Sequence, residues 1–196
     1  MQLDDVHAIK YGDVLVEGEG WPNCIHVIEH PGGRILVDTG MIDSTPELDE
    51  QWGIRFDADK IPRDVVCVIN THLHFDHCGG NRLFAGTPIH VQRTEREAAR
   101  EPDYTIPEWV EFEGATYVEH DGEAEIAHGV RVIPTPGHTA GHQSVLVDTD
   151  DGLVVLGGDV GYTWKLFDAS ESGQLLMSLR PRRIWLAHQA EPRDLG

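Results

Sequence analysis

The sequence predicts an α/β fold in which two β-sheets pack face to face and helices cover their outer sides. Strand-like segments fall into two groups, in residues 7–92 and 116–189, and each group has a helix-like segment after its main strands. Such segments bury their apolar faces best in a layered arrangement. The 196 residues can bury one substantial core, and no linker-like stretch divides them. Residues 1–196 are therefore expected to form a single domain.

The first group starts with strands and turns. The segment "HAIKYGDVLV" (residues 7–16) is expected to break at its Tyr-Gly-Asp, and "CIHVIEH" and "RILVDTG" flank the turn "PGG". Residues 41–62 lack a clear period and predict an irregular loop with one helical turn. The apolar, β-branched run "DVVCVIN" (residues 64–70) suits a strand buried on both faces. A short helix from "GGNRLF", a strand from "TPIHVQ" and a helix from "TEREAAR" complete this group.

The second group follows an expected loop over residues 101–114. Strands are predicted for "TYVEH", "EAEIA", "VRVIPT", "HQSVLVD" and "LVVLGGD", the last two joined by the turn "TDDG". The segment "SESGQLLMSL" (residues 170–179) is a helix candidate because Ser170 can cap it. The segment "RIWLAHQ" is expected to be the last strand and to end in a histidine.

Charge and cysteine content exclude several classes of function. The chain has 15 Lys and Arg against 34 Asp and Glu, a net charge of −19, so it should repel nucleic acids and anionic membranes. The densest basic run, "RPRR" at residues 180–183, is too short to form a binding patch. Three cysteines without paired spacing, a start unlike a signal peptide and the lack of a long apolar segment predict a cytoplasmic protein.

One stretch, "NTHLHFDHCGGN" (residues 70–81), carries most of the chemistry. His72 and His74 alternate with a leucine, so on an extended segment they point to the same side. Asp76 and His77 follow at once, and a tight turn would aim them at a second point. Imidazole and carboxylate ligands suit zinc first, with iron, manganese or cobalt as alternatives. Four ligands in six residues exceed what one tetrahedral ion takes from so short a segment, which favours two metal ions.

Other polar residues follow predicted strands and extend this set. His138 comes after "VRVIPT", Asp159 after "LVVLGG", and His188 after "RIWLA". Loops gather at the end of a sheet core, so these residues are expected to converge on one edge. His142 is expected either to hydrogen-bond a ligand or simply to pack. The remaining histidines are interpreted as ordinary surface or core residues: His7, His26, His30, His90, His120 and His128.

The motifs "THLHFDHCGG", "TPGHTAGHQS", "GGDVGYT" and "LAHQAEP", in this order and preceded by "ILVDTG", resemble the metallo-β-lactamase superfamily. The resemblance spans the chain from about Arg34 to His188. It implies a four-layer αββα sandwich with a two-metal site on its edge. It also implies that Asp38 is an acidic residue that lies next to the metal loop without ligating a metal. The ligands that it implies are His72, His74 and His138 for one metal, Asp76, His77 and His188 for the other, and Asp159 between them.

Within this superfamily, Tyr162 distinguishes possible subfamilies. A tyrosine three residues after Asp159, together with "HLHFDHCGGN" and "PGHTAGHQS", is similar to the N-acyl homoserine lactonases, which quench quorum-sensing signals. Glyoxalase II, a thioester hydrolase, shares the ligand set. A glyoxalase II-like thioester hydrolase, or another small-ester hydrolase, is therefore the alternative. The interpretation of Tyr162 as a half-buried loop aromatic also stays open.

The resemblance implies a dinuclear metal-dependent hydrolase, a carboxylic ester hydrolase that opens the ring of N-acyl homoserine lactones or related lactones by attack of a metal-bridging hydroxide. Tyr162 would hydrogen-bond the attacked carbonyl oxygen, and Asp76 would pass a proton to the leaving oxygen. The expected partner is a small lactone, with no further cofactor, and homodimerisation is left open. Several aromatic residues on predicted loops could border the substrate, without a basis for assigning one: Trp21, Trp52, Phe56, Tyr104, Trp109 and Trp164.

Overall fold

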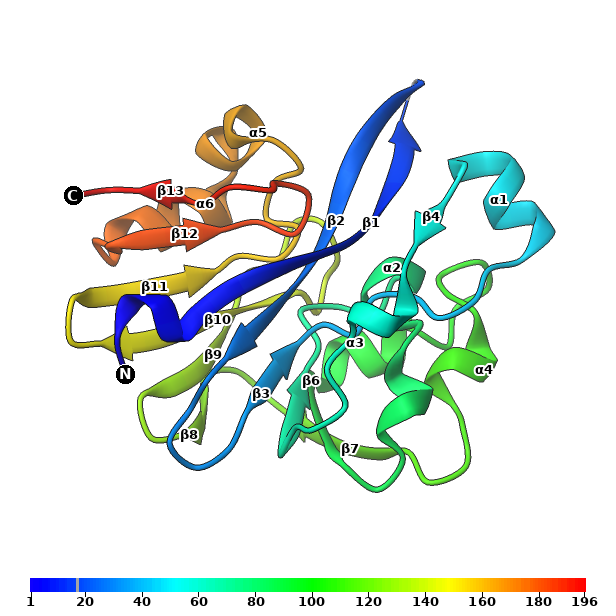
Figure 1. Cartoon of the computed structure of the whole chain (residues 1–196), viewed down its shortest axis with the longest axis horizontal. Coiled ribbons are helices and arrows are strands. Elements are labelled where there is room, and N and C mark those ends of the chain that lie inside the picture. The colour runs from blue at the N-terminus through cyan, green and yellow to red at the C-terminus, as the bar shows by residue number, and fades with distance from the viewer. Residues whose placement is uncertain (17) are drawn as a thin grey trace.

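The computed structural model describes residues 1–16 and 18–196, and it contains two mixed β-sheets with helices on their outer sides (Figure 1). The first sheet has the strand order β4-β1-β2-β3-β5-β6-β7. Its strands are β1 (Val6–Val16), β2 (Glu19–Ile28), β3 (Ile35–Val37), β4 (Arg55–Phe56), β5 (Cys67–Ile69), β6 (Pro88–Gln92) and β7 (Thr116–His120). The half formed by β3, β5, β6 and β7 is parallel, and the remaining pairs are antiparallel.

The second sheet has the order β13-β12-β11-β10-β9-β8. Its strands are β8 (Ala124–Ala127), β9 (Val130–Pro134), β10 (Gln143–Thr149), β11 (Gly152–Leu156), β12 (Arg183–Trp185) and β13 (Arg193–Asp194). Only β11 and β12 run parallel, because α5 and α6 connect them.

The helices are short. They comprise α1 (Pro46–Trp52), α2 (Phe75–Cys78), α3 (Arg93–Ala98), α4 (Pro107–Val110), α5 (Trp164–Ala169) and α6 (Glu171–Ser178), with 3-10 turns at Leu3–Asp5, Ala58–Lys60 and Asn81–Phe84. Ser170 caps α6 as expected, since its hydroxyl oxygen accepts a hydrogen bond from the Gly173 amide. Among the described residues, no helix is long and apolar enough to cross a membrane.

Alternating side chains on the strands build three apolar layers. On β10, Val145 and Val147 face the other sheet and pack against residues such as Ile35 and Ile69, while Leu146 faces outward. Outside the second sheet, Phe167 of α5 and Leu176 of α6 cover this outer face. Outside the first sheet, Phe84 and Trp109 cover Leu36, Val68 and Ile89. This order of layers confirms the predicted αββα sandwich.

Several expectations about single elements were wrong. The first strand does not break at Tyr11-Gly12-Asp13, because β1 continues through that point with a register shift between Lys10 and Gly12. A bulge of this kind absorbs one extra residue without ending the strand. In residues 41–62 the expected helical turn is present as α1, but the strand β4 there was not expected, nor were α4, α5 and β13. These elements are too short to show a period in sequence.

The core between the sheets predicts a large stability difference between two Leu→Ala variants. Leu156 is fully buried between the sheets, whereas Leu166 on α5 is half exposed. Leu156→Ala should lower the free energy of unfolding by about 2–5 kcal/mol through lost burial and a cavity. Leu166→Ala, the matched control, should change it by less than about 0.5 kcal/mol. Urea unfolding curves measure both, and equal effects would argue against this core.

Candidate metal centre

The histidine-rich loop leaves the end of β5, a strand buried in the middle of the first sheet. The loop begins with Asn70 and Thr71, which are buried, and continues with His72, whose side chain is inaccessible to solvent. Residues 75–78 then form α2, a single turn that begins directly after His74. Because of this turn, the side chains of Asp76 and His77 face a different point from those of His72 and His74, as the sequence pattern suggested.

Three imidazole nitrogens meet at one point. His72 Nε2 lies 3.1 Å from His74 Nδ1, His74 Nδ1 lies 2.9 Å from His138 Nε2, and His138 Nε2 lies 3.1 Å from His72 Nε2. His138 arrives on the loop between β9 and β10, 64 residues after His74. The fold therefore brings together two segments remote in sequence, which their positions after predicted strands had led us to expect at one edge.

A second group lies beside the first. Asp76 Oδ2 lies 3.7 Å from both His77 Nε2 and His188 Nε2. Asp159 joins the two groups, because its Oδ2 is 3.2 Å from His188 Nε2, 3.4 Å from His77 Nε2 and 3.6 Å from His138 Nε2. All seven ligand candidates from the sequence are thus collected at one edge of the sandwich.

The other nitrogen of each buried ring has a partner that fixes the ring. His77 Nδ1 lies 2.8 Å from Asp38 Oδ2, and His188 Nδ1 lies 3.1 Å from the Pro22 carbonyl oxygen, so each Nδ1–H can donate outward. His72 Nδ1 lies 3.1 Å from the Thr71 hydroxyl. In the neutral form of each ring these contacts place the proton on Nδ1 and turn Nε2 toward the cluster, which is the tautomer that ligates a metal.

Asp38 holds the metal loop from behind. Its Oδ1 accepts a hydrogen bond from the Thr71 amide (2.7 Å), and its Oδ2 accepts from the Thr71 hydroxyl (2.8 Å) as well as from His77. The residue has φ of 60°, a left-handed conformation that aspartate tolerates better than most side chains. The carboxylate therefore connects the end of β3 with two points of the loop.

His142 is both packed in the protein interior and hydrogen-bonded. The Asp159 amide donates to His142 Nε2 (3.1 Å), and His142 Nδ1 lies 2.9 Å from the Thr135 hydroxyl. This arrangement needs a close backbone approach, because a Cβ on Gly158 would lie 2.8 Å from His142 Nε2. Burial lowers the pKa of His142 to about 3, so the ring stays neutral and positions the chain just before Asp159.

The two groups of ligands differ in their electrostatics. Burial lowers the pKa of His72 well below its usual value, and it lowers the pKa of His138 to about 4. For His77, burial acts in the same direction, but the carboxylates of Asp159, Asp76 and Asp38 outweigh it and raise the pKa. The pKa of Asp159 is held low by His188 and His77 against the effect of burial. The first group is therefore neutral, and the second is an arrangement of imidazoles with carboxylates.

These donors fit divalent metal ions. Three unprotonated ring nitrogens about 3 Å apart repel one another, and a cation between them reverses that repulsion. Around one tetrahedral zinc ion such nitrogens would lie roughly 3.3 Å apart, close to the spacing found. Among the residues that the structure describes, His77 Nε2 and Asp159 Oδ1 are buried without a hydrogen-bond partner. Metal ligation would satisfy both atoms.

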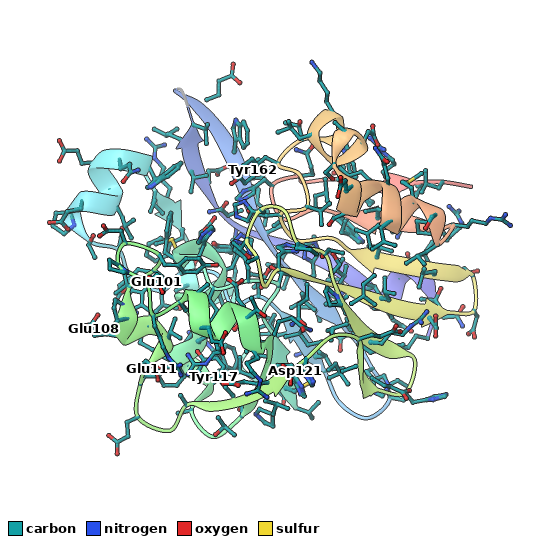
Figure 2. All side chains as sticks on the ribbon, turned by 180° about the vertical axis from the view of Figure 1, so that it is seen from behind. Glu101, Glu108, Glu111, Tyr117, Asp121 and Tyr162 are labelled. Carbon is teal, nitrogen blue, oxygen red and sulfur yellow. The ribbon has the colours of Figure 1, made fainter. Side chains whose placement is uncertain are left out.

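A pocket of about 720 Å³ opens over the cluster. The ligand candidates His74, Asp76, His138, Asp159 and His188 border it, as does Tyr162. Figure 2 shows Tyr162 between the β1–β2 hairpin and the loop before α5, and its hydroxyl lies 3.1 Å from His138 Nδ1. Burial and the nearby Asp159 raise the pKa of Tyr162 to about 12, so its hydroxyl keeps its proton at neutral pH.

The aromatic residues left open by the sequence divide into two sets. Trp21, Trp52 and Tyr104 border the pocket. The others pack elsewhere: Trp109 is buried in the apolar cluster outside the first sheet, Phe56 packs against the same cluster, and Trp164 packs on Phe167 beneath the Arg193 guanidinium. Cys78 is a buried free thiol whose pKa is raised to about 12 by burial, and it lies beside Leu73 and Thr105.

An αββα sandwich with seven converging histidines and aspartates at its edge defines a metal-binding α/β protein. The model of the metallo-beta-lactamase superfamily matches residues 20–188, and the chain belongs to this superfamily. Among its curated relatives, an N-acyl homoserine lactonase of Bacillus cereus is 36% identical over 168 residues, which cover 75% of this chain and 67% of the relative. The N-acyl homoserine lactonase AttM of Rhizobium radiobacter is 30% identical over 196 residues, which cover 81% and 72%.

A solved structure shows the same relationship in three dimensions. A variant of AiiA from B. thuringiensis, with N-decanoyl-L-homoserine bound at its active site, has a TM-score of 0.80 to this chain at 27% identity, and the match covers 93% of this chain and 92% of the other. The superfamily predicted from the motifs is thus confirmed.

The contacts of Asp38 predict that its amide analogue weakens metal binding. In Asp38→Asn the side-chain NH₂ must face either the Thr71 amide or the pair of donors at Oδ2, and each arrangement sets donor against donor. Metal affinity should fall by about 10–100-fold, as measured by competition with a chromophoric chelator. Asp43→Asn, an exposed carboxylate paired with Arg82, is the control and should leave affinity unchanged. Wild-type affinity in Asp38→Asn would remove Asp38 from the support of the site.

Proposed function

We propose that this protein is a metal-dependent hydrolase that opens the ring of N-acyl homoserine lactones or closely related lactones. The observation that carries the proposal is the Tyr162 hydroxyl, which borders the same pocket as both groups of ligand candidates and lies 3.1 Å from His138 Nδ1. The lactonase relatives, matched over most of this chain, support it. The chain also carries a net charge of −19, which suits a neutral small molecule better than a polyanion.

Two divalent ions are proposed as the cofactors, with zinc as the first candidate because of the nitrogen and oxygen ligands. His72, His74 and His138 would hold one ion, Asp76, His77 and His188 the other, and Asp159 would contact both. Such ions supply a nucleophilic hydroxide at neutral pH and polarise the carbonyl of the substrate. The remaining tasks fall to the side chains of the chain itself.

Tyr162 is proposed to stabilise the oxygen of the attacked carbonyl. Since His138 Nδ1–H can donate to the Tyr162 oxygen, the hydroxyl proton is free to point into the pocket. A neutral phenol in this position donates a hydrogen bond as negative charge develops on the substrate oxygen.

Asp76 is proposed to pass a proton to the ring oxygen as it leaves, after accepting that proton from the hydroxyl group that has added to the carbonyl carbon. Its side chain borders the pocket, and the buried Tyr11 hydroxyl donates to its carbonyl oxygen at 2.7 Å, which fixes the backbone there. A carboxyl group within reach of both the cluster and the substrate can act as a general acid.

The acyl chain of the substrate is proposed to lie along the apolar side of the pocket. Val14 and Val16 of β1, Leu48 and Trp52 of α1, and Ile106 supply this side. Burying a chain here removes apolar surface from water at about 25 cal/mol per Å². The length of the acyl chain should therefore affect binding more than the rate of ring opening.

Some expectations stay predictions. A cytoplasmic location agrees with the three free, buried cysteines. The single domain over residues 1–196 agrees with the continuous core between the two sheets. Homodimerisation stays open, as the sequence left it.

Removing one hydroxyl group should separate catalysis from metal binding. Tyr162→Phe should lower kcat by about 10²–10³-fold, because one donor to the developing oxyanion is lost, while metal content stays at the wild-type level. The control is Tyr117→Phe, which removes a hydroxyl that bonds to Val110 and Asn81 away from the pocket and should keep kcat. Unchanged turnover in Tyr162→Phe would eliminate its role as oxyanion donor.

The activity itself is tested by a substrate panel with counted metal. N-acyl homoserine lactones of several acyl lengths, simple γ-lactones and a thioester should be followed by proton or thiol release. Lactone opening is expected only with about two metal ions per chain, and it should disappear after chelation and return with zinc. Thioester cleavage without lactone opening would retain the metal site and replace the proposed substrate by that of a glyoxalase II-like enzyme.

A further inference from the structure

A buried carboxylate outside the ligand set joins three segments of the site. Glu95, on α3, is inaccessible to solvent. Its Oε1 accepts hydrogen bonds from the Leu73 amide at 2.8 Å and from the Tyr104 hydroxyl, and its Oε2 accepts from the Thr139 hydroxyl at 2.7 Å. We call Glu95 with these three donors the Glu95 clamp. In sequence, this glutamate is only one residue of the helix predicted for "TEREAAR".

The three donors of the Glu95 clamp belong to three different parts of the site. Leu73 lies between His72 and His74, so its amide is part of the backbone that spaces these two rings. Thr139 directly follows His138, which is the third ring of that group. Tyr104 borders the pocket, and its ring centroid lies 4.9 Å from that of His74.

The backbone near Thr139 also fits tightly against α3. A Cβ on Gly141 would lie 2.2 Å from the Glu95 amide nitrogen, so only glycine allows this approach. The loop that carries His138 is therefore held against α3 at two points, the hydroxyl of Thr139 and the backbone of Gly141. The carboxylate itself gains from this arrangement, since a buried charge is tolerated only when donors solvate it.

We propose that Glu95 is a positioning residue that fixes the spacing between the pair His72 and His74 and the third ring, His138, and thereby sets the affinity of these three nitrogens for a divalent ion. The same carboxylate fixes Tyr104 on the pocket wall. The inference rests on the metal site of the proposed function but not on the choice of substrate.

The chemistry of the three donors gives a sharp pair of variants. In Glu95→Gln the amide oxygen can take the place of Oε1 and accept from Leu73 and Tyr104, while the NH₂ donates to the Thr139 oxygen, whose hydroxyl can rotate. In Glu95→Ala all three donors lose their acceptor, and the two loops lose their common anchor. The glutamine variant should therefore rescue what the alanine variant loses.

The experiment is a zinc titration of metal-depleted protein in competition with a chromophoric chelator. Glu95→Ala should bind one of its two zinc ions, the one assigned to His72, His74 and His138, at least about 10-fold less tightly than wild type, and Glu95→Gln should stay within about 3-fold. The absorption spectrum of the Co²⁺-loaded protein should change in Glu95→Ala and be retained in Glu95→Gln. Glu97→Ala, an exposed glutamate on the same helix, is the control and should match wild type in both measurements.

A purely structural role gives a different result. If Glu95→Ala melts at a lower temperature but binds zinc with wild-type affinity and spectrum below that temperature, the proposal is overturned. If Glu95→Ala does not fold, Thr139→Val removes only the donor to Oε2 while keeping the side-chain shape. This variant should lower zinc affinity by several-fold, and wild-type affinity in it would equally overturn the proposal.

The outcome is distinct from that of the substrate panel. Zinc affinity and the Co²⁺ spectrum do not depend on which ester or lactone is cleaved. A wild-type protein that binds two ions and opens no lactone would refute the proposed substrate and leave the Glu95 clamp supported by its own data.

Discussion

The main constraint on the structure is the mutual repulsion of the ligand atoms that are gathered at one edge of the sandwich. Nitrogens of His72, His74 and His138 lie about 3 Å apart with no protons to share, and Asp159 reaches rings of both groups. Such a cluster opposes folding unless a cation joins it and the surrounding chain holds it. The sandwich holds the cluster in place, because each ligand candidate follows a strand or a turn that is anchored in the buried core. The ends of such strands move little.

Residues that hydrogen-bond the ligand candidates fix the geometry of the cluster. Asp38 fixes His77 and the loop backbone, Pro22 orients His188, and His142 positions the amide of Asp159. Glu95 adds a connection between the loops of His72 and His138. Each of these contacts joins fixed hydrogen-bonding partners, so its loss should lower the affinity of the cluster for a metal ion. Rigid support of this kind lets a small protein build a precise site from short helices.

The two sides of the pocket are proposed to have different roles, one in the reaction and the other in the choice of substrate. On one side, Tyr162 and Asp76 border the pocket at the ligand cluster, where we propose that they stabilise charge and transfer a proton. On the other, the β1–β2 hairpin and α1 supply apolar side chains that have no part in the reaction, and both elements lie at the border of the fold (Figure 1). Since the pocket residues Val14, Val16 and Trp52 lie outside the core between the two sheets, they can vary while the metal centre stays the same.

The sequence by itself determined the superfamily, the two-sheet architecture and the set of ligand candidates, because these depend on local patterns: apolar strands that end in histidine or aspartate, and dense motifs of fixed spacing. It left the bulge in β1, the helices α1, α4 and α5 and the role of Glu95 undetermined. Only the tertiary structure decided these, since helices of one or two turns have no readable period and are stabilised by remote packing. Glu95 in particular resembles any helix acid in sequence, and its meaning comes from donors on Leu73, Tyr104 and Thr139, which long-range folding brings to it.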